Sequence, residues 1–170
     1  VIIRNIPCIR DVNTLIDIIA DMGVTVEHID KHTCRFKADN IQPEYLQSRE
    51  FAEKTAKIRG SVMLVGPLLA RFGKAYIPKP GGDKIGRRRL DTHFIGLQNL
   101  GAKFEYNADG KFYNVEGKNL KGTYMLLDEA SVTGTANKKQ TAVMAQGTTT
   151  IYNAACEPYI QQLCKMLNKM

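Results

Sequence analysis

The sequence predicts an α/β fold built from a repeated strand–helix–strand–strand unit. Residues 1–38 carry an apolar strand pattern, a helix with a periodic apolar stripe and two further strand patterns. The same order returns over residues 75–115, and residues 148–168 begin it again. The copies start at positions 1, 75 and 148, which are 74 and 73 positions apart. This spacing indicates an internal repeat.

The boundaries of these elements follow from local signals. Asp11 is suited to capping the first helix, and Gly23 is the kind of residue that follows a helix end; Gly101 stands in the same place in the second copy. We therefore predict strands at 1–5, 24–29 and 34–38 with a helix from 11, strands at 75–78, 103–106 and 111–115 with a helix at 90–100, and a strand at 148–153 with a helix at 157–168.

Two long helices are predicted between the copies. Residues 54–72 are apolar on nearly all sides from 62 to 69, so we expect one buried central helix with a kink at Pro67. A strand at 122–128 and a second helix at 133–146 precede the third copy. The repeats would thus pack around buried helices.

Length and composition indicate one globular domain spanning residues 1–170. The chain is 44% hydrophobic and 24% charged, which is typical of a soluble protein. Neither a membrane span nor a signal pattern is recognisable, so we expect a cytoplasmic location. The four cysteines lack the spacing of a zinc site, and we interpret them as free thiols, with no metal site.

The net charge of +7 and the pI near 9.3 favour an anionic partner. A nucleic acid is one alternative, namely a basic binding module without enzymatic activity. The basic residues lack interleaved aromatic side chains and a recognisable reading motif, which argues against it. A phosphorylated small molecule is the other alternative.

The loop PGGDKIGRRRLDTH at residues 80–93 is the strongest candidate for that anion site. Gly81 and Gly82 allow a close approach of a ligand to the backbone. Four cations follow them directly before a predicted helix, whose free N–H groups also attract anions. A solvated basic loop is the alternative, but Asp83 between the glycines and the cations favours a functional site.

The longer string PGGDKIGRRRLDTHFIGLQNLGA resembles the signature of the UDP-N-acetylglucosamine enolpyruvyl transferase family. The segments IRGSVMLVGPLLARFGKA, SVTGTAN and TTIYNAACEPYI are similar to further family landmarks in the family's order. The resemblance covers nearly the whole chain. It implies an inside-out α/β barrel, in which three repeats pack their long helices inside and their sheets outside, and two such domains facing each other across an active site.

The resemblance also implies an activity. Members of this family move the enolpyruvyl group of phosphoenolpyruvate to the 3-hydroxyl of UDP-N-acetylglucosamine in peptidoglycan synthesis, without a metal or redox cofactor. The chain corresponds to most of the loop-bearing domain and looks cut at both ends. We expect it to need the second domain of the same enzyme as its partner and to be inactive alone.

Asp83 stands where most family members carry a reactive cysteine, which implies a role as general acid or in product release. An exposed aspartate with a pKa of about 3.9 is a poor acid at neutral pH, so loop closure would have to raise that pKa. A turn or capping aspartate is the alternative. Because a carboxylate is not a soft nucleophile, we expect resistance to epoxide inhibitors of the fosfomycin type.

Arg88 and Arg59 match two family arginines that bind phosphoenolpyruvate. Arginine suits both positions because its guanidinium group can grip a phosphate with two hydrogen bonds. For Arg59 a structural ion pair is the alternative.

The nucleotide sugar would be bound by two segments. The resemblance assigns Arg88, Arg89, Leu90, Asp91 and Thr92 to one of them, and Ser131, Val132 and Thr133 to the loop that supports the diphosphate. Arg89 replaces a proline common in the family. A hydroxyl-rich turn such as Ser131–Thr133 also caps a helix, and the two roles are compatible because both use the same N–H groups. His93 matches the motif, but a histidine at a helix start is more often structural than a base.

Two features depart from the simplest interpretation. Lys138, Lys139 and Gln140 stand where the family has apolar residues of a central helix. Burying two lysines is costly, so this stretch is exposed, was altered, or packs differently. Shikimate-pathway enolpyruvyl transferases share the chemistry and are an alternative family, although PGGDKIG and LDTH favour the nucleotide-sugar enzyme.

Overall fold

The computed structural model describes residues 1–78, 90–108 and 112–170. Within this part, the chain divides into two compact units. The first contains residues 1–61, and the second contains residues 62–77 together with the described residues from 90 to 170.

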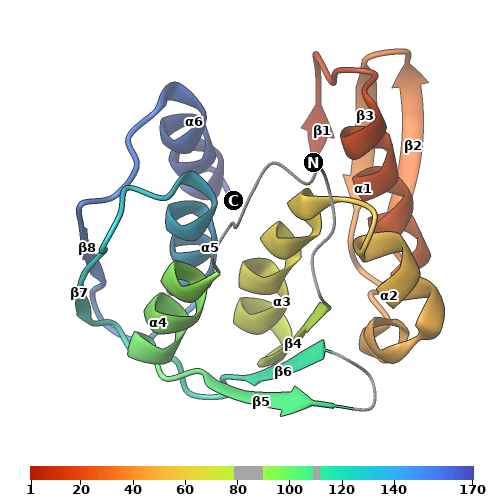
Figure 1. Ribbon diagram of the computed structural model, residues 1–170. Helices are drawn as coiled ribbons and strands as arrows, with labels where there is room; N and C mark the ends of the chain where they lie inside the picture. Colours follow the sequence, from red (N-terminus) through yellow and green to blue (C-terminus); the bar gives the residue numbers. More distant parts are fainter. Residues whose placement is uncertain (79–89, 109–111) are drawn as a thin grey trace. The chain divides into compact units, whose positions relative to one another are not determined.

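The first unit contains a three-stranded antiparallel sheet. Its strands are β1 (Ile2–Ile3), β3 (Thr33–Lys37) and β2 (Thr25–Asp30), in that spatial order. Helix α1 (Arg10–Asp21) lies along this sheet (Figure 1). Ile18 is fully buried on α1, and Cys34 is 3% exposed on β3. The predicted strand–helix–strand–strand unit is therefore confirmed for the first copy.

The first unit continues with short helices. They are the 3-10 helix η1 (Pro43–Gln47), α2 (Arg49–Thr55) and the start of the 3-10 helix η2 (Arg59–Leu64). The hydroxyl of Ser48 caps α2 by accepting from the N–H of Phe51 at 3.1 Å. Phe51 is 2% exposed, so α2 presents an apolar side to the interior of this unit.

The single long helix predicted at residues 54–72 is wrong. The chain instead forms α2, η2 and α3 (Val65–Phe72). The hydroxyl of Ser61 lies 3.0 Å from the carbonyl oxygen of Thr55 and 2.9 Å from that of Ile58, so a side chain satisfies carbonyl groups that a continuing helix would have used. Pro67 lies in the first turn of α3, where its missing N–H needs no partner, and it marks no kink.

The second unit repeats the strand order of the first. Its sheet is β4 (Lys74–Pro78), β6 (Phe112–Glu116) and β5 (Lys103–Asn107), with α4 (Asp91–Asn99) between β4 and β5 in the sequence. Strands β5 and β6 are antiparallel, and Phe104 pairs with Val115. This shared order confirms the second copy of the repeat.

Glycines follow the equivalent helices of both copies. Gly23 after α1 has φ of 102°, and Gly101 after α4 has φ of 99°. Residues with a side chain rarely adopt this left-handed region. The two glycines therefore turn the chain from each helix into its hairpin, as the sequence predicts.

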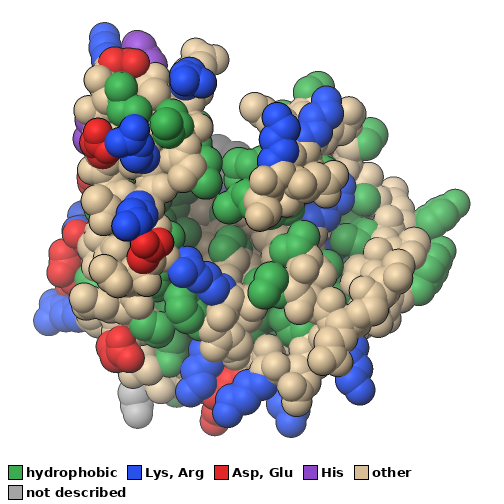
Figure 2. Space-filling model, turned by 180° about the vertical axis from the view of Figure 1, so that it is seen from behind, with side chains coloured by type: hydrophobic (Ala, Val, Ile, Leu, Met, Phe, Trp, Pro, Cys, Tyr) green, Lys and Arg blue, Asp and Glu red, His purple; other side chains and the backbone are tan. Residues whose placement is uncertain are grey.

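The third copy begins with β8 (Thr150–Tyr152) and α6 (Pro158–Leu167), which confirms the predicted strand and helix. Strand β8 pairs in parallel with β7 (Tyr124–Leu126). Tyr124, Leu126 and Tyr152 are more than 60% exposed and lie on one face of this pair. Figure 2 shows hydrophobic side chains projecting at that edge of the second unit.

Helix α5 (Val132–Ala142) is the central helix of the second unit. It contacts α3, α4 and α6 (Figure 1). Its buried positions are largely polar: Thr135, Asn137, Lys138 and Thr141 are each fully buried. The second unit is thus organised around a helix whose packing depends on hydrogen bonds as well as on apolar contacts.

Taken by element order, the fold is mixed α/β. The strands of the described residues form three separate sheets, so they do not close into a barrel. Within the same residues, no helix combines the length and the apolar character that crossing a membrane requires. All four cysteines are free thiols, as predicted.

Candidate functional site

The first turns of α4 and α5 lie against each other in the second unit. A Cβ atom added at Gly134 would come within 3.1 Å of the Thr92 methyl group and 3.0 Å of the Ser131 hydroxyl oxygen. The absence of a side chain at Gly134 therefore lets the two helix starts approach closely. This contact brings together two segments that the sequence analysis assigned to one ligand.

Thr92 connects the start of α4 to an acidic pair. Its hydroxyl lies 3.2 Å from a carboxylate oxygen of Asp128 and 3.3 Å from one of Glu129, and Thr92 itself is 5% exposed. The two carboxylates are exposed and follow β7 directly. The sequence analysis did not include Asp128 and Glu129 among the site residues. Two adjacent carboxylates at the end of a predicted strand were the available signal.

Ser131 is the N-cap of α5. Its hydroxyl oxygen accepts from the N–H of Gly134 at 3.2 Å, which confirms the capping role considered from the sequence. The first turn of a helix carries further N–H groups without partners inside the helix, and the helix dipole makes this end positive. The turn can therefore also hold an anion.

The two residues after Ser131 point to different surroundings. Val132 is half-buried and packs against the apolar cluster of Ala136, Ala155 and Ile160. Thr133 is exposed, although its hydroxyl lies 3.2 Å from Nε2 of His93. At Val132, only the backbone is suited to meeting a polar ligand.

His93 has a structural position between α4 and α5. It is 3% exposed, and the side-chain amide of Asn137 donates to its Nδ1 at 3.0 Å. Because Nδ1 accepts, Nε2 carries the proton and donates to Thr133. This neutral tautomer and its two partners agree with the expectation that His93 is no general base.

Asn137 links α5 to the start of α3. Its amide nitrogen also donates to the carbonyl oxygen of Val62 at 2.9 Å, and its amide oxygen accepts from the N–H of Gly66 at 3.0 Å. A buried side chain with this many partners holds α5 in one position. The first turn of α5 is thereby set relative to α3 and α4.

Lys138 is fully buried, and its amino nitrogen has no hydrogen-bond partner within the described residues. Burial lowers its pKa to about 8, although the negative charges of Asp128 and Glu129 act in the opposite direction. The possibility that the whole Lys138–Gln140 stretch is exposed is therefore wrong. The lysine has no counterpart among the predicted site residues, because charge at this position argued against burial.

The remaining predicted site residues are distributed as follows. Leu90 and Asp91 lie at the start of α4, next to Thr92. Arg59 is the first residue of η2, is half-buried and belongs to the first unit. Asp83, Arg88 and Arg89 lie outside the described residues, so the structure tests neither their positions nor their roles.

The whole chain, residues 1–170, matches the family described as EPSP synthase (3-phosphoshikimate 1-carboxyvinyltransferase). The chain belongs to the EPSP synthase family. The transferase motif recognised in residues 80–102 is therefore part of a family match that extends to both ends of the sequence.

Curated relatives place the chain within one part of that family. It is 64% identical over all 170 residues to a UDP-N-acetylglucosamine 1-carboxyvinyltransferase of Bacteroides fragilis and 61% identical to one of Porphyromonas gingivalis. These matches confirm the resemblance inferred from the motif. The chain spans 39% of the length of each of these relatives.

The fold of this EPSP synthase family member is shared with solved structures. The enolpyruvyl transferase NikO from Streptomyces tendae superposes with a TM-score of 0.78 over 98% of this chain and 38% of that one, at 19% sequence identity. At such low identity the similarity concerns the fold alone. It confirms the mixed α/β architecture of an enolpyruvyl transferase domain.

Proposed function

We propose that the chain is part of an enzyme that transfers the enolpyruvyl group of phosphoenolpyruvate to the 3-hydroxyl of UDP-N-acetylglucosamine and releases phosphate. The observation that carries this proposal is the 61–64% identity, over the whole chain, to proteins named for that reaction. The product would enter peptidoglycan synthesis, and the enzyme would act in the cytoplasm. Because the chain spans 39% of these relatives, the proposal includes a need for further polypeptide.

The joined starts of α4 and α5 would bind the nucleotide part of UDP-N-acetylglucosamine. The cap at Ser131 and the exposed Thr133 offer N–H and hydroxyl donors to the diphosphate. Leu90, Asp91 and Thr92 lie at the neighbouring helix start, where uracil and ribose would be held together with Arg88 and Arg89. Asp128 and Glu129 would repel an anion that strays from this position, since their carboxylates lie beside Thr92.

Phosphoenolpyruvate would be held by Arg59 and Arg88, whose guanidinium groups suit its phosphate. Asp83 would protonate the methylene carbon, so that the sugar hydroxyl can attack the neighbouring carbon and form a tetrahedral intermediate. Loss of phosphate from this intermediate then gives the product. For this role Asp83 must be protonated at neutral pH, which requires that closure of the site raises its pKa.

The fold proposed for the complete domain is the inside-out α/β barrel. The repeated strand order of the two sheets and the central position of α5 support it. The single-domain assignment of residues 1–170 stays a prediction.

A second candidate is transfer of enolpyruvyl to shikimate 3-phosphate. It is favoured by the family's own description and by the solved EPSP synthase of Acinetobacter baumannii, which superposes with a TM-score of 0.63 over 89% of this chain and 34% of that one, at 14% identity. The much higher identity to the nucleotide-sugar enzymes favours the first candidate.

A chimera tests both candidates. The matching segment of the Bacteroides fragilis relative is replaced by these 170 residues, which are 64% identical to it. Phosphate release is then measured with phosphoenolpyruvate and either acceptor. We expect turnover with UDP-N-acetylglucosamine alone; a folded chimera that uses only shikimate 3-phosphate would reverse the assignment. The 170-residue chain without the rest should release no phosphate, and turnover by it would contradict the need for a second domain.

A further inference from the structure

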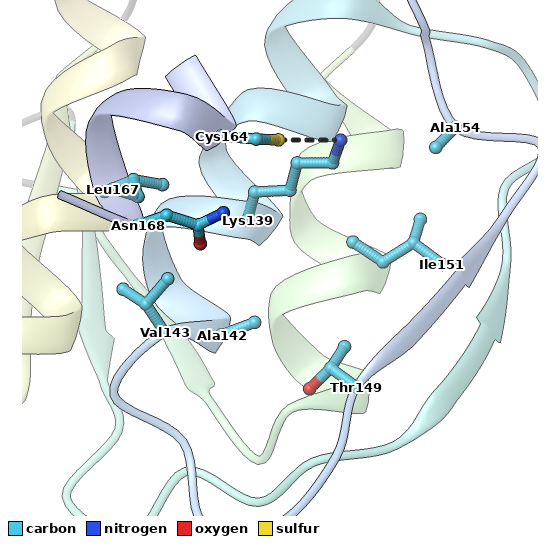
Figure 3. Close-up of a pocket in the computed structure, with 9 residues that line it drawn as sticks. All are labelled: Lys139, Ala142, Val143, Thr149, Ile151, Ala154, Cys164, Leu167 and Asn168. Carbon is cyan, nitrogen blue, oxygen red and sulfur yellow. Dashed lines mark hydrogen bonds between the residues drawn. The ribbon is translucent and has the colours of Figure 1, made fainter. Parts of the chain in front are cut away.

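A pocket of about 380 Å³ lies between α5, β8 and α6 in the second unit (Figure 3). Its walls are mainly apolar and include Val143, Ile151 and Leu167. Two reactive side chains line it as well, the amine of Lys139 and the thiol of Cys164. The proposed transfer reaction uses neither of them.

The amine and the thiol are in direct contact. Nζ of Lys139 donates to Sγ of Cys164 at 3.2 Å, as the dashed line in Figure 3 shows. Lys139 extends from α5, and Cys164 lies on α6, 25 residues further along the chain. Cys164 is half-buried, and the pocket in front of it is large enough to admit a small oxidant such as hydrogen peroxide. The geometry thus combines a thiol, a neighbouring nucleophile and an access route.

We propose that Lys139 and Cys164 form a reversible sulfenamide cross-link when the protein meets hydrogen peroxide. In the first step the sulfur attacks one peroxide oxygen, the O–O bond breaks, and Cys164 becomes a sulfenic acid while one water leaves. The sulfur is oxidised by two electrons and the peroxide is reduced. In the second step the neutral amine of Lys139 attacks this sulfur, the S–O bond breaks, and a second water leaves with the amine proton. The products are one S–N bond and two water molecules.

The surroundings favour this product over others. Condensation needs an amine that is already beside the sulfur, and here the two atoms need to approach by less than the length of one ordinary bond. Both side chains extend from helices that pack together, α5 and α6, so the cross-link requires no rearrangement of the backbone. A sulfenic acid that is captured in this way is withheld from further oxidation to sulfinic acid, which is irreversible in most proteins.

Intact-mass measurement of the 170-residue chain tests the proposal. After treatment with a small excess of hydrogen peroxide we expect a loss of about 2 Da, as one S–N bond replaces an S–H and an N–H bond. Peptide mapping should then find Lys139 joined to Cys164. A thiol reductant such as dithiothreitol should restore the original mass.

Matched variants separate this product from a disulfide, which gives the same mass change. Lys139→Arg keeps the positive charge but lacks a nucleophilic amine, so the joined peptides should be absent and Cys164 should gain oxygen instead. Cys164→Ser should abolish the product, whereas Cys156→Ser should leave it unchanged. The far-ultraviolet circular dichroism of each variant shows whether it is folded. The proposal is overturned if folded wild-type protein adds oxygen at Cys164 without a cross-link, or if Lys139→Arg loses the same mass through Cys164.

Discussion

The side chain of Lys138 fills the space beside Gly96 that any other residue at position 96 would need for its Cβ atom. An ideal Cβ there would lie 2.6 Å from Cδ and 2.9 Å from Cγ of Lys138, and closer still to its Cε. Gly96 belongs to α4 and Lys138 to α5, so this pair determines how closely the two helices approach. The start of each helix carries part of the proposed nucleotide site.

Gly96→Ala should destabilise the 170-residue chain by about 1–3 kcal/mol, because the added methyl group overpacks the helix contact. Its gain in helix propensity, about 1 kcal/mol, offsets part of this loss. In a Lys138→Ala background the same change should stabilise, since the colliding side chain is gone. Urea unfolding of the four proteins measures the coupling. Equal effects of Gly96→Ala in both backgrounds would contradict the contact.

The buried amine of Lys138 should make stability depend on pH. Its pKa is about 8 in the folded chain and 10.5 in its ordinary state. Between these two values the unfolded chain binds more protons than the folded one, so the free energy of unfolding should rise with pH. A difference of this size corresponds to about 3 kcal/mol, which is missing below pH 8 and regained above pH 10.5.

Chemical unfolding of wild type and Lys138→Met from pH 7 to 10.5 measures this dependence as the difference between the two proteins. The variant should be more stable at pH 7, and its advantage should shrink as pH rises. Lys139→Met is the matched control and should retain the wild-type profile. A difference between wild type and Lys138→Met that does not change with pH would contradict the burial of a titrating amine.

Ser131 allows the capping role to be separated from the binding role. Ser131→Ala removes the bond to the N–H of Gly134 and should cost about 0.5–2 kcal/mol of stability. Ser131→Asp retains a cap and should preserve stability, yet its negative charge should weaken binding of UDP-N-acetylglucosamine to the chimera at least tenfold. Calorimetric titration and thermal unfolding report the two effects. Unchanged affinity in Ser131→Asp would remove α5 from the nucleotide site.

The chimera should resist an epoxide inhibitor of the fosfomycin type, because the carboxylate of Asp83 is a poor nucleophile compared with a thiolate. Asp83→Cys should create sensitivity, with an adduct at position 83 in the mass spectrum. Inactivation of the unaltered chimera with an adduct on Asp83 would contradict the expectation.

The sequence by itself determined the repeat, its helix ends and the family. Gly23 and Gly101 were recognisable because a left-handed residue after a helix needs glycine, and this requirement is local. The strand and helix patterns of the copies likewise depend on residues a few positions apart. The motif around Asp83 identified the family because it is a continuous string, although its placement lies outside the described residues.

Only the tertiary structure decided which polar residues are inside and how the helix starts meet. Ser61 ends the predicted long helix by binding carbonyl groups, a competition that periodicity does not record. Thr92 meets Asp128 and Glu129 across a sequence distance of 36 and 37 residues. Lys138 is buried because Gly96, on another helix, leaves room for its stem. Local patterns report which residues prefer water, whereas the space available to a side chain depends on its neighbours in the fold.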